Sequence, residues 1–595
     1  MKKKIYSILL VFSFVLCILS APISTKAAAT QEMNIYAMYL DSPEKGESTL
    51  LESKGHALLI DLGRYSHLPS ILKQLNALDI THVDICLSHL HSDHVGGSST
   101  DLLAGLRTLT ESGITIDHLY LPGKEFSIYS SRYQAKYDKI EQYMSSRTSI
   151  QYLSLGSYIT VGDITGRVIG PVTDWSFSPQ NYADTSGNIS DQMYTLYENN
   201  CSLAMIFTCG NTRYFCSGDS FSDETNALVS RYGSALSCDI MKLCHHGTPS
   251  GNTQALIDAV SPTYAFSSNA GFTGKNTDNG HWSTFTAGSL ATKYGMCYHT
   301  GTQKKTLIFH VADDQITLYQ GLTISKANKL TGWQYLYGSD GINMDYNTYY
   351  LNSDGKPLTG FQKIGNKYYS FDSTGLLQYG SFDEAGEYSG WVDTAEGTRY
   401  YCMDKSKKSA YVAVGFQSID DTLYYFSPEG YLYLPSIEED SDPEIKKIGS
   451  AYYAIDYSGS VACDEWVETD SGYYYFNKSG KMARNCVCKI ESNYYIFDTS
   501  GHLLTSDSGY RLVTLSGKKY AVNPNGQAAV SRCVKINKNT YYFSANGSMV
   551  KKKAVKIGKN LYYFNAKGIM VRNKTIKWNG VKYKCLTNGR MKRVK

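Results

Sequence analysis

Two hydrophobic patterns divide the chain. From residue 31 to residue 325, short apolar runs alternate with stretches of helical spacing. The run His56–Leu62 predicts a strand, Leu68–Leu78 places its apolar residues on one face of a helix, and Val83–Leu87 predicts a buried strand. Strands alternating with helices in this way predict an α/β domain over residues 31–325.

From residue 331 to residue 595, tyrosine-rich runs recur with polar turns between them, as in Leu423–Gly430 and Tyr474–Gly480. Each unit predicts an aromatic strand, an Asn/Asp/Ser-Gly turn and a second short strand, which together make a β-hairpin. Because a single hairpin is marginally stable, stacking of the units predicts an all-β solenoid. Closing glycines recur every 21 residues at Gly459, Gly480 and Gly501, and again at Gly526, Gly547, Gly568 and Gly589.

The first thirty residues have the pattern of a secretion signal. Lys2, Lys3 and Lys4 precede an apolar run from Ile5 to Leu19, and Ala27–Ala29 provide an A-x-A-like cleavage site. The run is shorter than the roughly 20 residues that span a bilayer, and no later segment is apolar enough. We therefore expect residues 1–30 to be a signal peptide and no transmembrane segment to remain after cleavage.

Composition narrows the classes of function. At roughly 100–200 residues per domain, the chain of 595 residues predicts two or three domains. A hydrophobic fraction of 42% and a charged fraction of 19% suit folded protein and argue against a disordered chain. The net charge of +4 does not indicate a strongly basic nucleic-acid surface. Most of the 51 tyrosines follow residue 330, which supports a division of the chain there.

Candidate chemistry is concentrated directly after the predicted strand Val83–Leu87, in the run Ser88-His89-Leu90-His91-Ser92-Asp93-His94. Residues i and i+2 of an extended run point the same way, so His89 and His91 can bind one metal ion. Asp93 and His94 follow where a helix can start, and they can face a second ion beside the first. Imidazole and carboxylate groups suit zinc or a similar divalent ion.

This run resembles the H-x-H-x-D-H signature of the metallo-β-lactamase superfamily. The resemblance implies an αββα sandwich with two divalent metal ions, zinc or manganese, at one edge. Asp61 resembles the family's supporting aspartate at an early strand end, and Asp219 resembles the carboxylate that bridges the two ions. His245 and His246 resemble a paired-histidine motif in which one member is a ligand. We expect His245 to be that ligand and His246 to support the site, although the sequence does not separate the two.

The chain departs from the family pattern between His94 and Asp219, where many members have another histidine ligand. Only His118 lies in that interval, inside an ordinary strand pattern that comes too early. Asn199-Asn200-Cys201-Ser202 instead resembles the N-x-S pattern of the hydrolase domain of bacterial competence proteins. Asn200 is therefore open to three interpretations: it supports a ligand, contacts substrate or caps a turn. Gly280-His281 resembles a Gly-His motif that comes later in the sequences of the same branch. His281 is therefore a general acid, a substrate contact or an ordinary loop residue.

The resemblance implies a hydrolase whose nucleophile is a metal-bound hydroxide, available at neutral pH because two cations lower the pKa of a shared water. Asp93 is expected to orient that hydroxide as well as to bind metal, and His281 is the second candidate catalytic residue. Phosphoesters, β-lactams and thioesters all suit such a site. The missing intermediate histidine makes a β-lactamase the least favoured of these.

The repeats resemble the choline-binding and glucan-binding cell-wall repeats of exported Gram-positive proteins. In choline binders, aromatic walls from neighbouring hairpins surround a quaternary ammonium group. Early units keep a Gly-aromatic step at Gly332-Trp333, Gly360-Phe361, Gly390-Trp391 and Gly415-Phe416, whereas later units have Val-Lys-Ile, as at Val534–Ile536. The expected partner is therefore a cell-wall polymer, through teichoic acid, choline or glycan, unless the tyrosines only fill the solenoid core.

The whole arrangement resembles the choline-binding phosphorylcholine esterases of Gram-positive surfaces. It predicts a secreted, cell-wall-associated hydrolase acting on envelope phosphoesters, with residues 331–595 as its wall anchor. Two alternatives stay open. One is an extracellular nuclease of the competence-protein branch, although the sequence lacks an evident Lys/Arg-rich track near the site motifs. The other is a non-catalytic cell-wall adhesin.

Overall fold

The computed structural model describes residues 31–42, 44–127, 131–172, 190–267, 294–337, 346–379, 388–404 and 409–594. The predicted signal peptide and His281 lie outside these residues. The chain divides into two compact units, Met1–Gln362 with Ser370–Gln378, and Lys363–Tyr369 with Tyr379–Lys595. Among the described residues, we find no helix with the length and apolar character needed to cross a bilayer.

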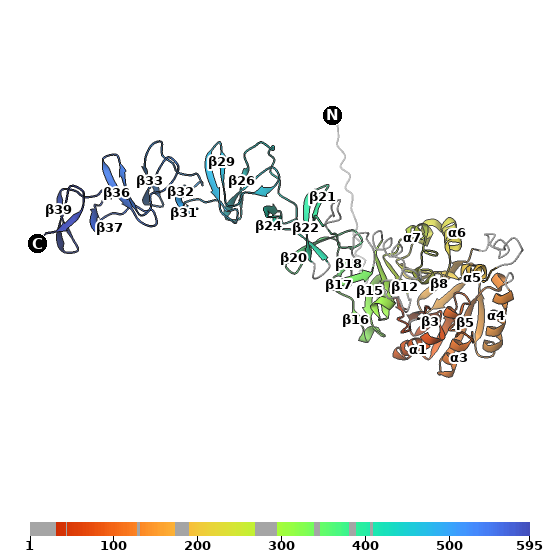
Figure 1. The fold of residues 1–595 in the computed structure, drawn as a ribbon. Coiled ribbons are helices and arrows are strands. Elements are labelled where there is room, and N and C mark those ends of the chain that lie inside the picture. Colours follow the sequence, from red (N-terminus) through yellow and green to blue (C-terminus); the bar gives the residue numbers. More distant parts are fainter. Residues whose placement is uncertain are drawn as a thin grey trace, which may run out of the picture. The chain divides into compact units, whose positions relative to one another are not determined.

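The first unit contains two β-sheets that pack face to face (Figure 1). The first sheet has the strand order β16-β15-β14-β1-β2-β3-β4-β5-β6. Its strands are β1 (Glu32–Ala37), β2 (Thr49–Ser53), β3 (His56–Ile60), β4 (His82–Cys86), β5 (Thr115–Pro122), β6 (Ser149–Leu153), β14 (Leu307–Ala312), β15 (Gln315–Gln320) and β16 (Asn328–Lys329).

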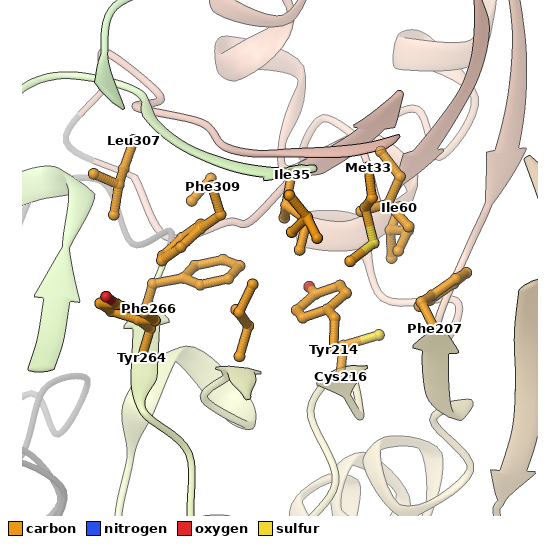
Figure 2. Close-up of a cluster of buried hydrophobic side chains, with 14 of the residues drawn as sticks. Met33, Ile35, Ile60, Phe207, Tyr214, Cys216, Tyr264, Phe266, Leu307 and Phe309 are labelled. Atoms are coloured by element: carbon orange, nitrogen blue, oxygen red, sulfur yellow. The ribbon is translucent and has the colours of Figure 1, made fainter. Parts of the chain in front are cut away.

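The second sheet has the strand order β13-β12-β11-β10-β9-β8-β7. Its strands are β7 (Tyr158–Val161), β8 (Ile164–Gly170), β9 (Ala204–Cys209), β10 (Thr212–Cys216), β11 (Ile240–Lys242), β12 (Tyr264–Ser267) and β13 (Met296–His299). Figure 2 shows the core between the sheets, where Met33, Ile35 and Ile60 of one sheet face Phe207, Tyr214 and Phe266 of the other.

Helices cover the outer face of each sheet, which completes the predicted αββα sandwich. Helices α1, α3 and α4 pack on the first sheet, and α6 and α7 pack on the second. The helices are α1 (Leu68–Ala77), α2 (Ser92–Val95), α3 (Ala104–Glu111), α4 (Ser131–Met144), α5 (Asp191–Asn200), α6 (Ser222–Tyr232), α7 (Gln254–Val260) and α9 (Thr300–Gln303).

Helix α1 illustrates how the sequence specifies these elements. Pro69 occupies its first turn, where a missing N–H costs nothing. Its buried residues Leu68, Ile71 and Leu75 are spaced by three and four, so they form one apolar stripe against the sheet. The predicted helix and both predicted strands are confirmed within two residues at each end, as α1, β3 and β4.

The rest of the chain is a series of β-hairpins, as predicted. Most hairpins form two-stranded sheets of their own, and β19–β23 and β24–β28 form two five-stranded sheets. The strands are β17 (Gly332–Tyr337), β18 (Tyr346–Leu351), β19 (Gly360–Ile364), β20 (Lys367–Phe371), β21 (Trp391–Thr394), β22 (Gly397–Asp404), β23 (Ser409–Val412), β24 (Gly415–Ile419), β25 (Thr422–Phe426), β26 (Glu444–Ile448), β27 (Ala451–Ile455), β28 (Ser460–Val461), β29 (Glu465–Thr469), β30 (Gly472–Phe476), β31 (Cys486–Ile490), β32 (Asn493–Phe497), β33 (Arg511–Leu515), β34 (Lys518–Val522), β35 (Arg532–Ile536), β36 (Asn539–Phe543), β37 (Lys553–Ile557), β38 (Asn560–Phe564), β39 (Lys574–Trp578), β40 (Val581–Cys585) and β41 (Met591–Arg593).

The polar turn of each repeat is stabilised by its own side chain, and it leads into hydrogen bonds with the preceding hairpin. In the turn after β30, the Asn477 side chain accepts hydrogen bonds from the Ser479 and Lys481 backbones at 2.9 and 3.1 Å, and Gly480 adopts a φ of 70°. The chain then bonds back to the preceding hairpin, where Met482 N donates to Tyr452 O at 2.9 Å. Because equivalent bonds recur from repeat to repeat, the turns hold neighbouring hairpins together.

The hairpin register fixes which residues can form aromatic walls. Trp466 pairs with Tyr475, and its ring lies 4.9 Å from that of Tyr495 in the next hairpin. In the last hairpins the corresponding position holds Cys533, which pairs with Tyr542, or Ala554. Val534, which the sequence pattern aligns with the aromatic residue, is instead a buried core residue. The aromatic wall is thus present at Trp466 and absent at Cys533.

Candidate metal centre

The candidate ligands follow strands whose carboxyl ends meet at one edge of the sandwich. In the first sheet, Asp61 follows β3 and His89 follows β4, and these two strands are parallel. In the second sheet, Asp219 follows β10, and the His245-His246 pair follows β11, which is parallel to β10. Within the second sheet, the backbone joins the Asp219 segment to the histidine pair, because His245 N donates to Gly218 O at 3.0 Å.

The short helix α2 turns the second half of the signature toward the site. His91 is its N-cap residue, and Gly96 ends the helix with a φ of 78° in the left-handed region. A Cβ at Gly96 would lie 2.9 Å from the Cα of Gly105 in α3, so both glycines are needed for this close approach. The compact turn leaves His94 fully buried and Asp93 partly exposed.

Four side chains lie close together at this edge: Asp93, His94, Asp219 and His246. Asp219 Oδ2 lies 3.2 Å from His94 Nε2 and 3.4 Å from His246 Nε2, and Asp93 Oδ2 lies 3.8 Å from the same His246 nitrogen. Ligands of a tetrahedral zinc ion, with bonds of about 2.0–2.1 Å, are separated by about 3.4 Å. The spacing of these four groups therefore fits a bound divalent ion.

A second set of candidate ligands lies beside His94, since the His89 ring is 4.1 Å from the His94 ring and 4.7 Å from the His91 ring. Asp219 Oδ1 and His89 Nε2 are buried and have no hydrogen-bond partner among the described residues. His91 Nε2 lies 2.7 Å from Glu198 Oε2, which leaves its Nδ1 as the nitrogen available to a metal. Glu198 also accepts a hydrogen bond from Lys136 Nζ at 2.7 Å. His89 and His91 are therefore the side chains that would hold a second cation, and Asp219 Oδ1 is a further candidate ligand.

The structure adds Glu47, which the sequence interpretation missed. Its carboxylate lies with the ligand atoms of His94, Asp219 and His246 in a group whose atoms are all within 4.8 Å of one another. Glu47 is buried and forms an ion pair of 2.6 Å with the buried Lys242. A lone acidic residue in a loop carries no spacing signal; only its place before the apolar strand β2 hints that it points inward.

The two histidines of the paired motif occupy different positions. His246 is buried and belongs to the group that contains Glu47, His94 and Asp219. His245 is partly exposed, and its Nε2 lies 3.8 Å from Asp219 Oδ2. The Nδ1 of His245 is within hydrogen-bond distance of the Thr248 and Ser250 hydroxyls, at 3.1 and 3.2 Å. These distances favour His246 over His245 as the histidine nearest the bridging carboxylate.

Charges in the site balance one another. Burial raises the pKa of Glu47 to about 7 despite the attraction of Lys242. Burial opposes protonation of His246, but Asp219 and Glu47 outweigh it and raise the pKa to about 10. The pKa of His94 is raised well above its usual range against the same burial penalty, mainly by Asp219 and Asp61. A divalent cation at these atoms would replace the imidazole protons that now neutralise the carboxylates.

Asp61 supports His94 from behind, as the sequence comparison implies. Its Oδ2 accepts hydrogen bonds from His94 Nδ1 and from Ser88 Oγ, both at 2.7 Å, and its Oδ1 accepts one from Ser88 N at 2.7 Å. The bond to Nδ1 fixes the tautomer in which His94 Nε2 faces Asp219. Asp61 adopts a φ of 60°, so the backbone is held in the left-handed region to aim this carboxylate.

Asn200 lies at the end of α5, and its Oδ1 accepts a hydrogen bond from Phe221 N at 2.9 Å. It therefore holds the segment that follows Asp219. His118, in β5, bonds to Asp84 at 2.9 Å and is not part of the cluster. The role of His281 stays a prediction, because this residue lies outside those described.

We predict that Asp61→Asn lowers metal affinity by about 10- to 100-fold, the usual cost of losing such a supporting group. The amide cannot accept all three hydrogen bonds, and its NH₂ group would oppose the N–H of His94. Competition with a chromophoric chelator measures the affinity.

The control for Asp61→Asn is Asp84→Asn, since Asp84 accepts comparable bonds from His118 outside the cluster. This control should bind metal like the wild type. Equal losses in both variants would contradict a specific role for Asp61.

Comparison with known families supports the same division of the chain. Residues 42–265 match the metallo-beta-lactamase superfamily, residues 530–583 match a choline-binding repeat, and residues 464–482 match a cell wall binding repeat. The fold and the site thus define a hydrolase-type domain with a candidate metal centre. The chain consists of a metallo-β-lactamase superfamily domain followed by choline-binding repeats.

Similar solved structures are choline-binding proteins of Streptococcus pneumoniae. CbpJ of strain TIGR4 is 20% identical over 44% of this chain and 100% of its own, with a TM-score of 0.24. Choline binding protein F, solved with a peptidoglycan analogue, is 21% identical over 48% and 96%, with a TM-score of 0.24. The modular autolysin LytC is 20% identical over 42% and 51%, with a TM-score of 0.20. No curated protein matches the chain.

Proposed function

We propose that the chain is an exported, metal-dependent phosphodiesterase whose repeats hold it at choline-bearing wall polymers. The observation that carries the proposal is the cluster of buried ligand atoms around the Asp219 carboxylate. Two divalent ions, zinc or manganese, would activate water for attack at neutral pH and neutralise negative charge on a phosphoryl group.

Within this proposal the side chains have separate tasks. Asp219, His94 and His246 would hold one ion together with Asp93, while His89 and His91 would hold the other. His245 stands at the partly exposed side of the site, where it can contact substrate. Asp93 is 18% exposed, so solvent reaches its carboxylate, which can orient the attacking water. His281 remains the candidate acid that protonates the leaving alcohol.

Glu47 and Lys242 have a different task, because their charges are paired with each other in the interior. The pair sets the negative charge around His94 and His246 without contacting solvent. Breaking such a pair by removing one partner is strongly destabilising, since it leaves an uncompensated buried charge.

The test is a substrate panel with metal removal. We expect p-nitrophenolate release from bis(p-nitrophenyl) phosphate and from p-nitrophenylphosphorylcholine, loss of both after treatment with a chelator, and recovery on addition of zinc or manganese. Hydrolysis that persists in excess chelator would contradict the proposal. A preference for a β-lactam would assign the centre to another reaction, and no hydrolysis at all would favour the adhesin.

A further inference from the structure

Two basic side chains, Lys45 and Arg64, stand on neighbouring loops beside the metal centre. Lys45 precedes Glu47 by two residues, and Arg64 follows Asp61 by three. The two loops are joined by a backbone hydrogen bond of 2.9 Å from Gly63 N to Glu47 O. Both basic residues are therefore tied to the segments that place Glu47 and Asp61.

A buried histidine, His67, fixes this pair of loops. Its Nδ1 accepts a hydrogen bond of 2.9 Å from Arg64 N, and its Nε2 lies 3.2 Å from Glu44 O. One ring nitrogen thus accepts and the other donates, which satisfies a neutral imidazole. A Cβ at Gly46 would lie 2.5 Å from the His67 ring, so the first loop passes directly against it. The loops are held by the core rather than by solvent-exposed contacts.

The Arg64 guanidinium keeps most of its donors available. Nη1 donates to Ser92 Oγ at 3.3 Å, and Nη2 lies 3.9 Å from Asp93 Oδ2. The side chain is 32% exposed, so the remaining donors are open to a ligand. An arginine in this state is suited to a phosphate group, which it can bind through two parallel hydrogen bonds.

Lys45 adds a second charge to the same place. It is exposed and has no hydrogen bond or ion pair with another described residue. Lys45 is followed directly by Gly46, which packs against His67, and then by Glu47 of the metal cluster, so the chain places Lys45 at the edge of the site. The nearby acid Glu44 is occupied by a hydrogen bond from Ser66. Two basic side chains thus lie on the loops next to Asp93.

We propose that Lys45 and Arg64 form an anion subsite that binds the phosphate adjacent to the phosphodiester under attack. This proposal rests on the proposed phosphodiesterase activity and specifies its substrate as a polymer of linked phosphodiesters. An isolated phosphocholine ester fits less well, because its trimethylammonium group would be repelled by two cations.

The polymer that fits best is a wall chain in which phosphates alternate with polyols. Under the proposed function, the repeats would hold the domain at choline-bearing wall polymers, whose phosphates would then be at high local concentration. Tyr65, next to Arg64, is 48% exposed and would offer a base a stacking surface. Single-stranded DNA is therefore the competing polyanion in the test.

The experiment compares kcat/KM for a glycerol-phosphate oligomer with kcat/KM for bis(p-nitrophenyl) phosphate, using the full chain. Arg64→Gln and Lys45→Gln are each expected to lower the ratio of the two values by about tenfold, the effect of one lost charge-assisted hydrogen bond. The control Lys73→Gln removes an equal charge from an exposed position on α1 and should leave the ratio unchanged. Calorimetry of oligomer binding to chelator-treated protein gives a readout independent of turnover.

The outcomes separate the two proposals. If the wild type hydrolyses neither substrate, the phosphodiesterase proposal fails, and oligomer binding still decides whether the subsite exists. If both substrates are hydrolysed and the variants change both equally, or bind the oligomer like the wild type, the subsite is wrong while the activity stands. A higher kcat/KM for a DNA oligonucleotide than for the polyol chain would overturn the assignment of the polymer.

Discussion

Asp219→Asn is expected to lower hydrolysis by at least about 10³-fold, because the centre would lose the several kcal/mol of charge stabilisation that its cations supply. Asp219 Oδ2 lies 3.2 Å from His94 Nε2 and 3.4 Å from His246 Nε2, and its other oxygen is buried without a hydrogen-bond partner among the described residues. The amide has nearly the same shape but carries no charge, and it offers only one ligand oxygen. Metal analysis should show fewer than two ions per chain.

The control for Asp219→Asn is Asp239→Asn, in the loop before β11. Asp239 Oδ2 accepts a hydrogen bond from Arg213 N at 2.8 Å, a contact that an amide oxygen preserves. This variant should keep full activity and metal content. Both variants should bind a choline matrix like the wild type, since the repeats are untouched. Wild-type metal content in Asp219→Asn, or loss of wall binding together with activity, would contradict this account.

A residue of the candidate centre can be predicted from sequence when the residues near it in the chain form a recognisable pattern with it. His89, His91, Asp93 and His94 fall within six residues after a buried strand, so their spacing alone indicates metal binding. The local pattern also predicts the strand before them, because Val83–Leu87 is continuously apolar apart from Asp84. Asp61 and Asp219 could be found only through the resemblance to a family, since a single aspartate after a strand is common.

The supporting charges are not predictable in this way. Glu47 forms an ion pair with Lys242, and Glu198 forms one with Lys136, across sequence separations of 195 and 62 residues. Each is a lone ionisable residue whose partner is chosen by the packing of the sandwich. The basic groups beside Asp93 were missed for the same reason: Lys45 and Arg64 come from separate loops, so they form no Lys/Arg-rich track in the sequence.

The boundary between the α/β domain and the repeats is another feature that the local sequence pattern does not determine. Sequence periodicity places the first hairpin, β17–β18, with the repeats, and its strand pairing is that of a repeat. Side-chain packing places it in the first unit, where Leu336, Tyr349 and Leu351 join the core between the two sheets. Tyr349 Oη also donates to Gly295 O at 3.1 Å, just before β13. A hairpin can thus match the repeat pattern in sequence and still complete the core of another domain.

Leu351→Ala is therefore expected to destabilise the metal-bearing unit, although residue 351 belongs to the repeat pattern. Leu351 is fully buried in the inter-sheet core, and truncating such a residue costs about 2–5 kcal/mol. The melting temperature of that unit should fall by roughly 5–10 °C. Calorimetry of the full chain measures it, and the transition of the first unit is identified as the one that zinc shifts upward.

Phe564→Ala is the matched control. Phe564 ends the second strand of hairpin β37–β38 as Leu351 ends that of β17–β18, and it is equally buried. Its truncation should lower the melting temperature only of the transition that zinc does not shift. If Leu351→Ala also lowers only that transition, the first hairpin belongs energetically with the repeats. If instead it lowers the melting temperature of the zinc-sensitive transition, any fragment of the first unit that ends before residue 351 lacks part of its own core.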